Sequence, residues 1–433
     1  MPSRTNRTTP PSDSSYRDMR HVVAVLGLMV CPAFAAELTL DQRAYLASRI
    51  YASLANFAHW QDAQGVDVET AYRSYLKKAL ASADRFDFSR ASMEFLATLH
   101  NGHTMFLDMA VVQQAGSLPF TARFVAGKWA ITDSQSPEVK PGDVLESIDG
   151  RPFEQFFQEQ RRFISASKDE WARHALFARL PGFAPYAHLF PVKFVAGFEG
   201  GRQMTIDRRA AKPSPPTATE GRWLEPGKVA YIRIPSFMSP EFEKRALELL
   251  REFRDAAALI VDVRGNMGGS TPGDLTEALM DRPYRWWTES TPMLLPFFRF
   301  QASRGGWQYQ PFDRPEFLWR SREQQPPKDG FKGNLALLVD GGCHSSCEDF
   351  TMPFKDNRRA LIAGETTAGS TGQPYMLDLG DGMTLMVGAK REMFPDGSRF
   401  EGVGIRPDLE IAPALEDIRQ GRDAVLEAVR KRL

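Results

Sequence analysis

The segment from residue 334 to residue 373 constrains the fold more than any other part of the chain. It begins with an apolar run, 334–339, that has the composition of a buried strand. Two glycines, Gly341 and Gly342, follow the run and permit a sharp turn, and a helical pattern then covers 348–355. A strand, a glycine turn and a helix in this order predict a strand-to-helix turn within an α/β core.

Two neighbouring serines, Ser345 and Ser346, lie in this turn. A hydroxyl at the start of a helix has free backbone N–H groups beside it, and a nucleophilic serine needs such donors for its oxyanion. Serine is also a favoured N-cap residue, so the pair could serve only to cap the helix. The local sequence leaves both interpretations open.

The alternation of strand and helix extends upstream of this segment. Residues 228–234 and 257–263 read as strands, and an amphipathic helix is expected between them at 240–254. We therefore expect an α/β domain over 223–433. The stretch 283–330, which is rich in aromatic residues and arginine, is interpreted as an insertion in that domain.

The first half of the chain divides into a helical part and a β-rich part. Residues 37–113 carry helical periodicity and predict an N-terminal helical domain. Residues 115–205 contain short apolar runs between turn signals, and the segment 140–150 (KPGDVLESIDG) is similar to the core of PDZ domains. That resemblance implies a domain that binds extended peptides by strand addition, and a β-rich spacer without a ligand is the alternative. A Pro/Ser/Thr-rich linker, 211–220, follows.

Residues 1–35 have the pattern of a signal peptide. Basic residues precede a short apolar run, 22–30, and Ala33-Phe34-Ala35 supplies a small-x-small cleavage site. The run is too short to span a membrane, so we expect an exported protein, periplasmic or secreted, without stable membrane insertion after cleavage. Equal numbers of basic and acidic residues, 54 of each, leave no basic field that would favour a nucleic acid.

Two of the three cysteines, Cys343 and Cys347, would remain in the mature chain, and they flank Ser345. On a helix this spacing brings the Cα atoms to about 6 Å, near the limit for a disulfide, and an oxidising compartment would permit one. Two buried small residues at a tight turn are the alternative. Two cysteines with one histidine are too few for a zinc site, and we expect neither a metal nor another cofactor.

The chain lacks the motifs of other common enzyme classes, among them HExxH, the P-loop and GxSxG. A serine nucleophile needs a base, and histidine is the usual one. His344 is adjacent to Ser345, and neighbouring side chains on a turn rarely converge. His103 follows a glycine on a short loop, where a histidine is more often exposed or capping than catalytic. Structural roles are favoured for the histidines in helical or aromatic contexts, which are His59, His174 and His188.

Gly341-Gly342, Glu348 and the segment 364–366 (GET) together resemble the serine-centred block of the C-terminal-processing (tail-specific) peptidases. The resemblance implies a crotonase/ClpP-like core and makes Ser345, which stands three residues before Glu348, the nucleophile. The usual base of that family is a lysine, and Ser370 stands at its position in this chain.

Without that lysine, the pattern is closer to the tricorn-protease-like branch. In that branch the catalytic histidine lies in a segment that is similar to 99–104 (LHNGHT) of this chain. The glutamate of the branch lies in a segment that is similar to 401–408 (EGVGIRPD). The resemblance therefore implies that His103 is the base and that Glu401 completes the charge relay. Gly102 stands where the branch has a serine that helps to orient the histidine, so fewer contacts to His103 are expected. For the oxyanion hole, the resemblance implies the backbone N–H groups of Ser346 and Gly268.

These residues lead us to expect an exported serine peptidase that hydrolyses peptide bonds of a peptide or protein substrate by acyl transfer. One alternative is a peptide-binding protein that keeps the fold without catalysis, which the missing lysine favours. Another is a serine esterase that uses the same residues on small acyl substrates.

Overall fold

The computed structural model describes residues 37–63, 65–180, 184–211, 217–293 and 316–433. The predicted signal peptide and Cys31 lie outside the described residues, as do parts of the predicted linker and insertion. Contacts join the described residues, from Glu37 onward, into one compact unit. None of the described helices is long and apolar enough to cross a membrane.

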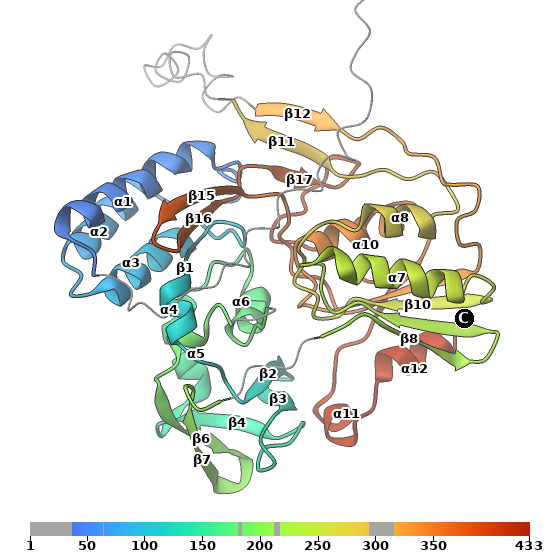
Figure 1. Cartoon of the computed structure of the whole chain (residues 1–433), viewed down its shortest axis with the longest axis horizontal. Helices are drawn as coiled ribbons and strands as arrows, with labels where there is room; N and C mark the ends of the chain where they lie inside the picture. The colour runs from blue at the N-terminus through green and yellow to red at the C-terminus, as the bar shows by residue number, and fades with distance from the viewer. Residues whose placement is uncertain (1–36, 64, 181–183, 212–216, 294–315) are drawn as a thin grey trace, which may run out of the picture. The chain divides into compact units, whose positions relative to one another are not determined.

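A six-stranded sheet forms the centre of the second half of the chain (Figure 1). Its neighbouring strands are parallel except for the β8–β9 pair, which is antiparallel. Because parallel strands end at one edge of a sheet, the loops that follow β10, β13 and β14 meet at that edge. In spatial order the strands are β18 (Leu409–Glu410), β14 (Leu361–Gly364), β13 (Asn334–Val339), β10 (Ala258–Asp262), β9 (Val229–Arg233) and β8 (Glu220–Glu225).

Helices cover both faces of this sheet. α7 (Pro240–Glu252), α8 (Gly273–Leu279) and α10 (Ser346–Asp356) pack apolar side chains on one face, and α12 (Ala424–Arg430) packs on the other, after the short helix α11 (Leu415–Gln420). α7 begins with Ser239 as N-cap and proline in the first turn, which are start signals visible in the sequence. The strands and helices predicted for this part are confirmed, and the α/β class with them; the finer crotonase/ClpP-like assignment stays a prediction.

The N-terminal part is helical as expected, with one exception. α1 (Leu40–Ser53) starts with a capping box formed by Thr39 and Gln42, and α2 (Val68–Leu80) and α3 (Arg85–Ala97) each start with a capping aspartate. A strand, β1 (Met105–Asp108), precedes α4 (Met109–Gln114) and pairs antiparallel with β16. The expectation of helix throughout 37–113 is therefore wrong at β1, because its partner strand lies far along the chain and a local pattern does not reveal it.

Residues 115–205 form the expected β-rich part. Its antiparallel strands are, in order, β2 (Phe120–Val125), β3 (Lys128–Ser134), β4 (Val144–Ile148), β6 (Lys193–Phe198) and β7 (Arg202–Asp207), and β5 (Arg151–Pro152) pairs with β4. Two helices that the sequence did not suggest, α5 (Phe153–Arg161) and α6 (Asp169–Leu176), pack beside the sheet. The PDZ-like assignment and the domain boundaries stay predictions.

Two smaller sheets complete the described structure. β15 (Tyr375–Gly380) and β16 (Met383–Val387) form a hairpin around Asp381-Gly382, both of which have positive φ, as a tight two-residue turn requires. β11 (Thr288–Pro292) and β12 (Glu316–Arg320), from the predicted insertion, pair with each other, and β11 also pairs with β17 (Arg391–Met393). Residues 294–315 of that insertion lie outside the described residues.

Candidate active site

Ser345 lies between β13 and α10, at the sheet edge where the loops meet. It is the N-cap residue of α10, but its side chain forms no capping hydrogen bond, so the simple capping interpretation is wrong. Its φ of 58° is in the left-handed region, which is unfavourable for a residue with a Cβ atom. Its N–H donates to the Ser370 carbonyl at 3.1 Å, and its carbonyl accepts from the N–H groups of Glu348 and Asp349. These bonds hold the serine in place.

His103 contacts Ser345 directly. Nε2 of His103 lies 3.0 Å from Ser345 Oγ, and Nδ1 lies 3.0 Å from Ser370 Oγ. The histidine is 4% exposed and sits on the loop between α3 and β1, while Ser345 is half-buried. The fold thus brings together two residues that are 242 positions apart in the sequence.

Ser370 lies between the histidine and Glu401. Its Oγ donates to Glu401 Oε1 at 2.9 Å, and the same carboxylate oxygen accepts from Asn101 Nδ2 at 2.7 Å and from Ser167 Oγ. Within the described residues, no direct hydrogen bond joins Glu401 to His103, so the link between them passes through the Ser370 hydroxyl. The expectation that Gly102 leaves His103 with fewer contacts is therefore corrected, because Ser370 supplies one.

An aromatic stack fixes the plane of the His103 ring. His344 lies on one face of it, with ring centroids 4.7 Å apart, and Trp171 stacks on the far side of His344 at 4.2 Å. Burial lowers the pKa of His344 to about 4. Burial, together with the neighbouring His344, also holds the pKa of His103 well below its ordinary 6.5. His103 is therefore a neutral imidazole that is able to accept a proton.

At the far end of this array, Glu401 interacts with a second titratable residue, His59. Burial raises the pKa of Glu401, although nearby His59 and hydroxyl donors oppose the rise. His59 Nδ1 lies 3.2 Å from Asp62 Oδ2. Burial acts against a charge on His59, but the carboxylates of Glu401 and Asp62 outweigh it and raise the pKa of His59. The charged forms of His59 and Glu401 therefore favour each other.

The two residues expected to form the oxyanion hole lie against Ser345. Ser346 begins α10, where the first N–H groups have no intrahelical acceptor. A Cβ atom on Gly268 would lie 2.7 Å from Ser345 Cβ, so only glycine allows this approach. The Gly268 N–H donates to Asn266 Oδ1 at 2.9 Å, however. A role as oxyanion donor requires that bond to open or to be shared.

A disulfide spans the turn that presents Ser345. Cys343 and Cys347 are bonded, their Cα atoms are 5.3 Å apart, and both residues are fully buried. The bridge ties the loop before Ser345 to the first turn of α10.

A charged group links the β-rich part to the same turn. Asp340, directly after β13, accepts from the N–H groups of Gly265 at 2.7 Å and Gly342 at 3.0 Å. It also pairs at 3.3 Å with Arg123 of β2, which pairs with Glu365 as well. Burial acts against the charge of Asp340, but Arg123, together with His174, the Gly265 N–H and Arg264, outweighs burial, so the pKa of Asp340 is lowered. An ionised Asp340 therefore holds in place the two loops that contain Gly265 and Gly342.

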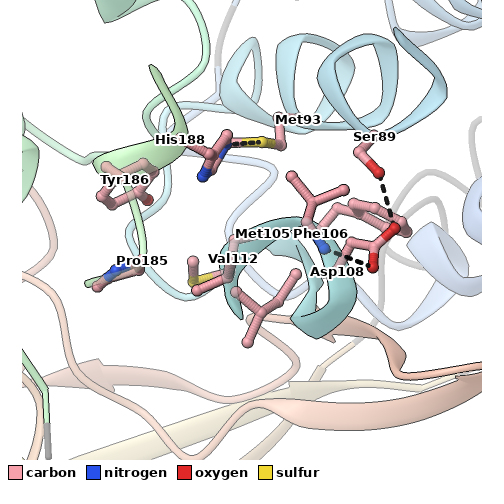
Figure 2. A pocket seen from close by; sticks show the side chains of 11 residues that line it. Ser89, Met93, Met105, Phe106, Asp108, Val112, Pro185, Tyr186 and His188 are labelled. Atoms are coloured by element: carbon pink, nitrogen blue, oxygen red, sulfur yellow. Dashed lines mark hydrogen bonds between the residues drawn. The ribbon is translucent and has the colours of Figure 1, made fainter. Parts of the chain in front are cut away.

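A small cavity lies between α3, β1, α4 and the segment around His188 (Figure 2). It encloses about 10 Å³, which is room for about one water molecule. Met93, Phe106 and Asp108 are among its lining residues, and none of the candidate site residues is. The cavity is too small for a peptide substrate.

Three residues at this site were not assigned from the sequence. Ser370 was visible only as the residue in place of a lysine, and Asn101 stands two positions before His103 in the segment that carries the resemblance. Ser167 belongs to no motif. It reaches the site because residues 165–168, between α5 and α6, pass beside the His103 loop, where its Oγ also accepts from the Gly102 N–H at 2.9 Å.

Comparisons with known proteins relate part of the chain to a peptidase family. Residues 228–411 match the model of the family described as peptidase family S41. The chain is 26% identical over 347 residues to the carboxyl-terminal-processing protease of Synechocystis sp., covering 77% of this chain and 73% of that protein. It is 28% identical over 183 residues to the chloroplastic carboxyl-terminal-processing peptidase 2 of Arabidopsis thaliana, covering 42% of this chain but only 31% of that protein.

A likeness in fold extends over nearly the whole chain. The structure of mature CPAF complexed with lactacystin superposes with a TM-score of 0.68 at 16% identity, covering 90% of this chain and 97% of that one. The family match itself covers the strands and loops that carry Ser345 and Gly268, whereas His103 lies outside it. Residues 228–411 are therefore similar to peptidase family S41, and the relatives that the chain matches include carboxyl-terminal-processing proteases.

Proposed function

We propose that this chain is an exported serine peptidase that hydrolyses peptide bonds by acyl transfer. Ser345 Oγ attacks the peptide carbonyl carbon while its proton passes to His103 Nε2. The imidazolium then gives that proton to the leaving amine nitrogen, and an ester remains on Ser345. Water, deprotonated by the same imidazole, hydrolyses the ester and regenerates the serine.

One observation carries the proposal: Ser345 Oγ lies 3.0 Å from Nε2 of a buried histidine. A general base has to lie within hydrogen-bond reach of the proton that it removes. The lowered pKa of His103 supports this role, since it keeps the imidazole free of a proton. Glu401, acting through Ser370, would stabilise the imidazolium once it forms. Ser346 and Gly268 are proposed as oxyanion donors.

The remaining parts of the proposal rest on the sequence and on the family. The leader-like residues 1–35 support export to the periplasm or beyond the cell. The set of serine, histidine and glutamate supports a place near the tricorn-protease-like branch. Residues 115–205 are proposed as a PDZ-like domain that binds the substrate peptide by strand addition at an edge strand of its sheet, of which β2 is one.

A catalytically inactive peptide-binding protein is the second candidate. The hydrogen bond from Gly268 N–H to Asn266 Oδ1 favours it, because an engaged donor does not stabilise an oxyanion.

A fluorophosphonate probe, combined with a casein-type peptide assay, separates the candidates. We expect the purified mature protein to become labelled and to cleave peptides, and the Ser345→Ala variant to do neither. Labelling without peptide cleavage would point to a serine esterase. A wild-type protein that neither becomes labelled nor cleaves peptides would favour the binding protein.

A further inference from the structure

The hydroxyl of Ser370 contacts His103, but Ser370 is not one of the three proposed catalytic residues, Ser345, His103 and Glu401. On the basis of the proposed function, we propose that Ser370 is a positioning residue that joins Glu401 to His103. We propose further that Gly102 is required because a side chain there would take the space of the Ser370 hydroxyl. The Ser370 hydroxyl acts on the reaction only through His103.

The hydrogen bonds in this array have one consistent direction. For His103 to accept a proton from Ser345, Nε2 has to be unprotonated, so the ring proton is on Nδ1. Nδ1–H then donates to Ser370 Oγ at 3.0 Å, and the Ser370 hydroxyl donates to Glu401 Oε1 at 2.9 Å. A hydroxyl suits this place because it donates and accepts at once. Glu401 thereby fixes the tautomer of His103 without touching it.

Gly102 leaves the space that this arrangement needs. A Cβ atom at Gly102 would lie 2.8 Å from Ser370 Oγ and 3.0 Å from Ser370 Cβ. The φ of Gly102 is not in the left-handed region, so its backbone conformation is open to other residues. Space, rather than backbone conformation, is therefore the reason for glycine at this position.

The backbone of Ser370 is fixed on both sides. Its N–H donates to Oε2 of the buried Glu348 at 3.0 Å, and its carbonyl accepts from the Ser345 N–H at 3.1 Å. The residue itself is fully buried. Ser370 thus positions the nucleophile through its carbonyl and the base through its hydroxyl, and Ser370→Ala removes only the second contact.

Steady-state kinetics of a double-mutant cycle test the proposal. Ser370→Ala should lower kcat about 100-fold to about 1,000-fold and change KM by less than about threefold, because the loss falls on the proton transfer. Gly102→Ala should cause a similar loss by displacing the hydroxyl. The double variant should lose less than the product of the two single losses, because the clash with the Ser370 hydroxyl is absent once that hydroxyl is removed. Ser92→Ala is the matched control, since it removes another buried hydroxyl, which bonds to Tyr75 and to the Phe88 carbonyl.

A second measurement does not depend on activity. Spectra of ¹⁵N-histidine-labelled protein should show His103 as the Nδ1–H tautomer in the wild type and as a mixture of tautomers in Ser370→Ala. If the wild type neither labels nor cleaves, the proposed function fails while the spectra still test the positioning role. A wild-type kcat for Ser370→Ala, losses that add fully in the double variant, or a tautomer that Ser370→Ala leaves unchanged would each overturn the inference.

Discussion

Ser345 holds a backbone conformation that a serine adopts only when its surroundings enforce it. Holding a residue that has a Cβ atom at positive φ costs about 1–3 kcal/mol of conformational free energy relative to a relaxed backbone. The bond from its N–H to the Ser370 carbonyl and the bonds from the α10 N–H groups to its own carbonyl offset that cost. The same strain directs Oγ toward His103 instead of toward the helix as a cap.

The shifts in the pKa values of His103 and Glu401 predict how the activity changes as the pH is lowered. Burial and His344 hold the pKa of His103 well below 6.5, so the base stays unprotonated to lower pH than an ordinary histidine. Burial raises the pKa of Glu401 above 4.5, so this carboxylate takes up a proton earlier than an ordinary one. We expect kcat/KM to fall as pH decreases, with protonation of His103 contributing below pH 6.5 and protonation of Glu401 contributing above pH 4.5.

The measurement is kcat/KM for one peptide from about pH 4 to about pH 8 at constant ionic strength. A midpoint above 6.5 would mean that a group other than this buried histidine limits the reaction.

The candidate site could be predicted from the sequence only where a residue belongs to a recognisable segment. Ser345, His103 and Glu401 were each proposed in that way, and the structure places His103 within 3.0 Å of Ser345. The mediating role of Ser370 could not be predicted, because a serine in place of a lysine carries no sign of what it contacts. Ser167 lies in no motif, and its contact with Glu401 depends on tertiary packing alone.

At the scale of elements, α10 depends on the disulfide that joins its first turn to the preceding loop. The two cysteines are only four positions apart, so the loop-entropy contribution of the bond is small, about 2 kcal/mol. We expect the double variant Cys343→Ala with Cys347→Ala to lose about that much free energy of unfolding. We also expect its kcat to fall, because the turn that holds Ser345 would loosen.

Denaturant unfolding and peptide turnover of the double variant check this prediction, with the oxidised wild type as control. Unchanged stability together with unchanged turnover would show that the bridge does not brace the site.

Elements with a strong local pattern were predicted well from the sequence. β9, β10 and β13 are apolar runs, α1 has a capping box, and the β15–β16 hairpin has an Asp-Gly turn, so each is encoded within a few residues. β1 was missed because it is four residues long and is specified by its pairing with β16. α5 and α6 were missed because their apolar residues lie among turn signals and strands.

At the scale of the whole molecule, the site draws on segments from every part of the described chain. The helical part provides His103, the sheet loops provide Ser345 and Ser370, and the β-rich part contacts the turn through Arg123. The site therefore depends on how these parts pack together.

We expect Arg123→Gln to lower both the free energy of unfolding and kcat. Removing the guanidinium leaves the buried Asp340 without its nearest cation. The cost should be about 2 kcal/mol, below that of a fully buried pair, because Arg123 is 24% exposed and water can partly solvate the remaining charge. Since Asp340 holds the loops at Gly265 and Gly342, the geometry around Ser345 should change as well.

Thermal unfolding and peptide turnover are the measurements. Arg151→Gln is the matched control, because it removes an exposed pair with Glu159 and should change stability by less than about 0.5 kcal/mol. If Arg123→Gln behaves like this control, catalysis does not depend on the β-rich part through Asp340.

The measurement to make first is peptide turnover by the wild-type protein beside Ser345→Ala and His103→Ala, with circular dichroism to show that all three are folded. If Ser345 is the nucleophile and His103 its base, each variant should lose about three to six orders of magnitude in kcat/KM, and the double variant should be no worse than either single variant. An active wild type whose turnover survives His103→Ala would contradict the proposed pair and place the base elsewhere.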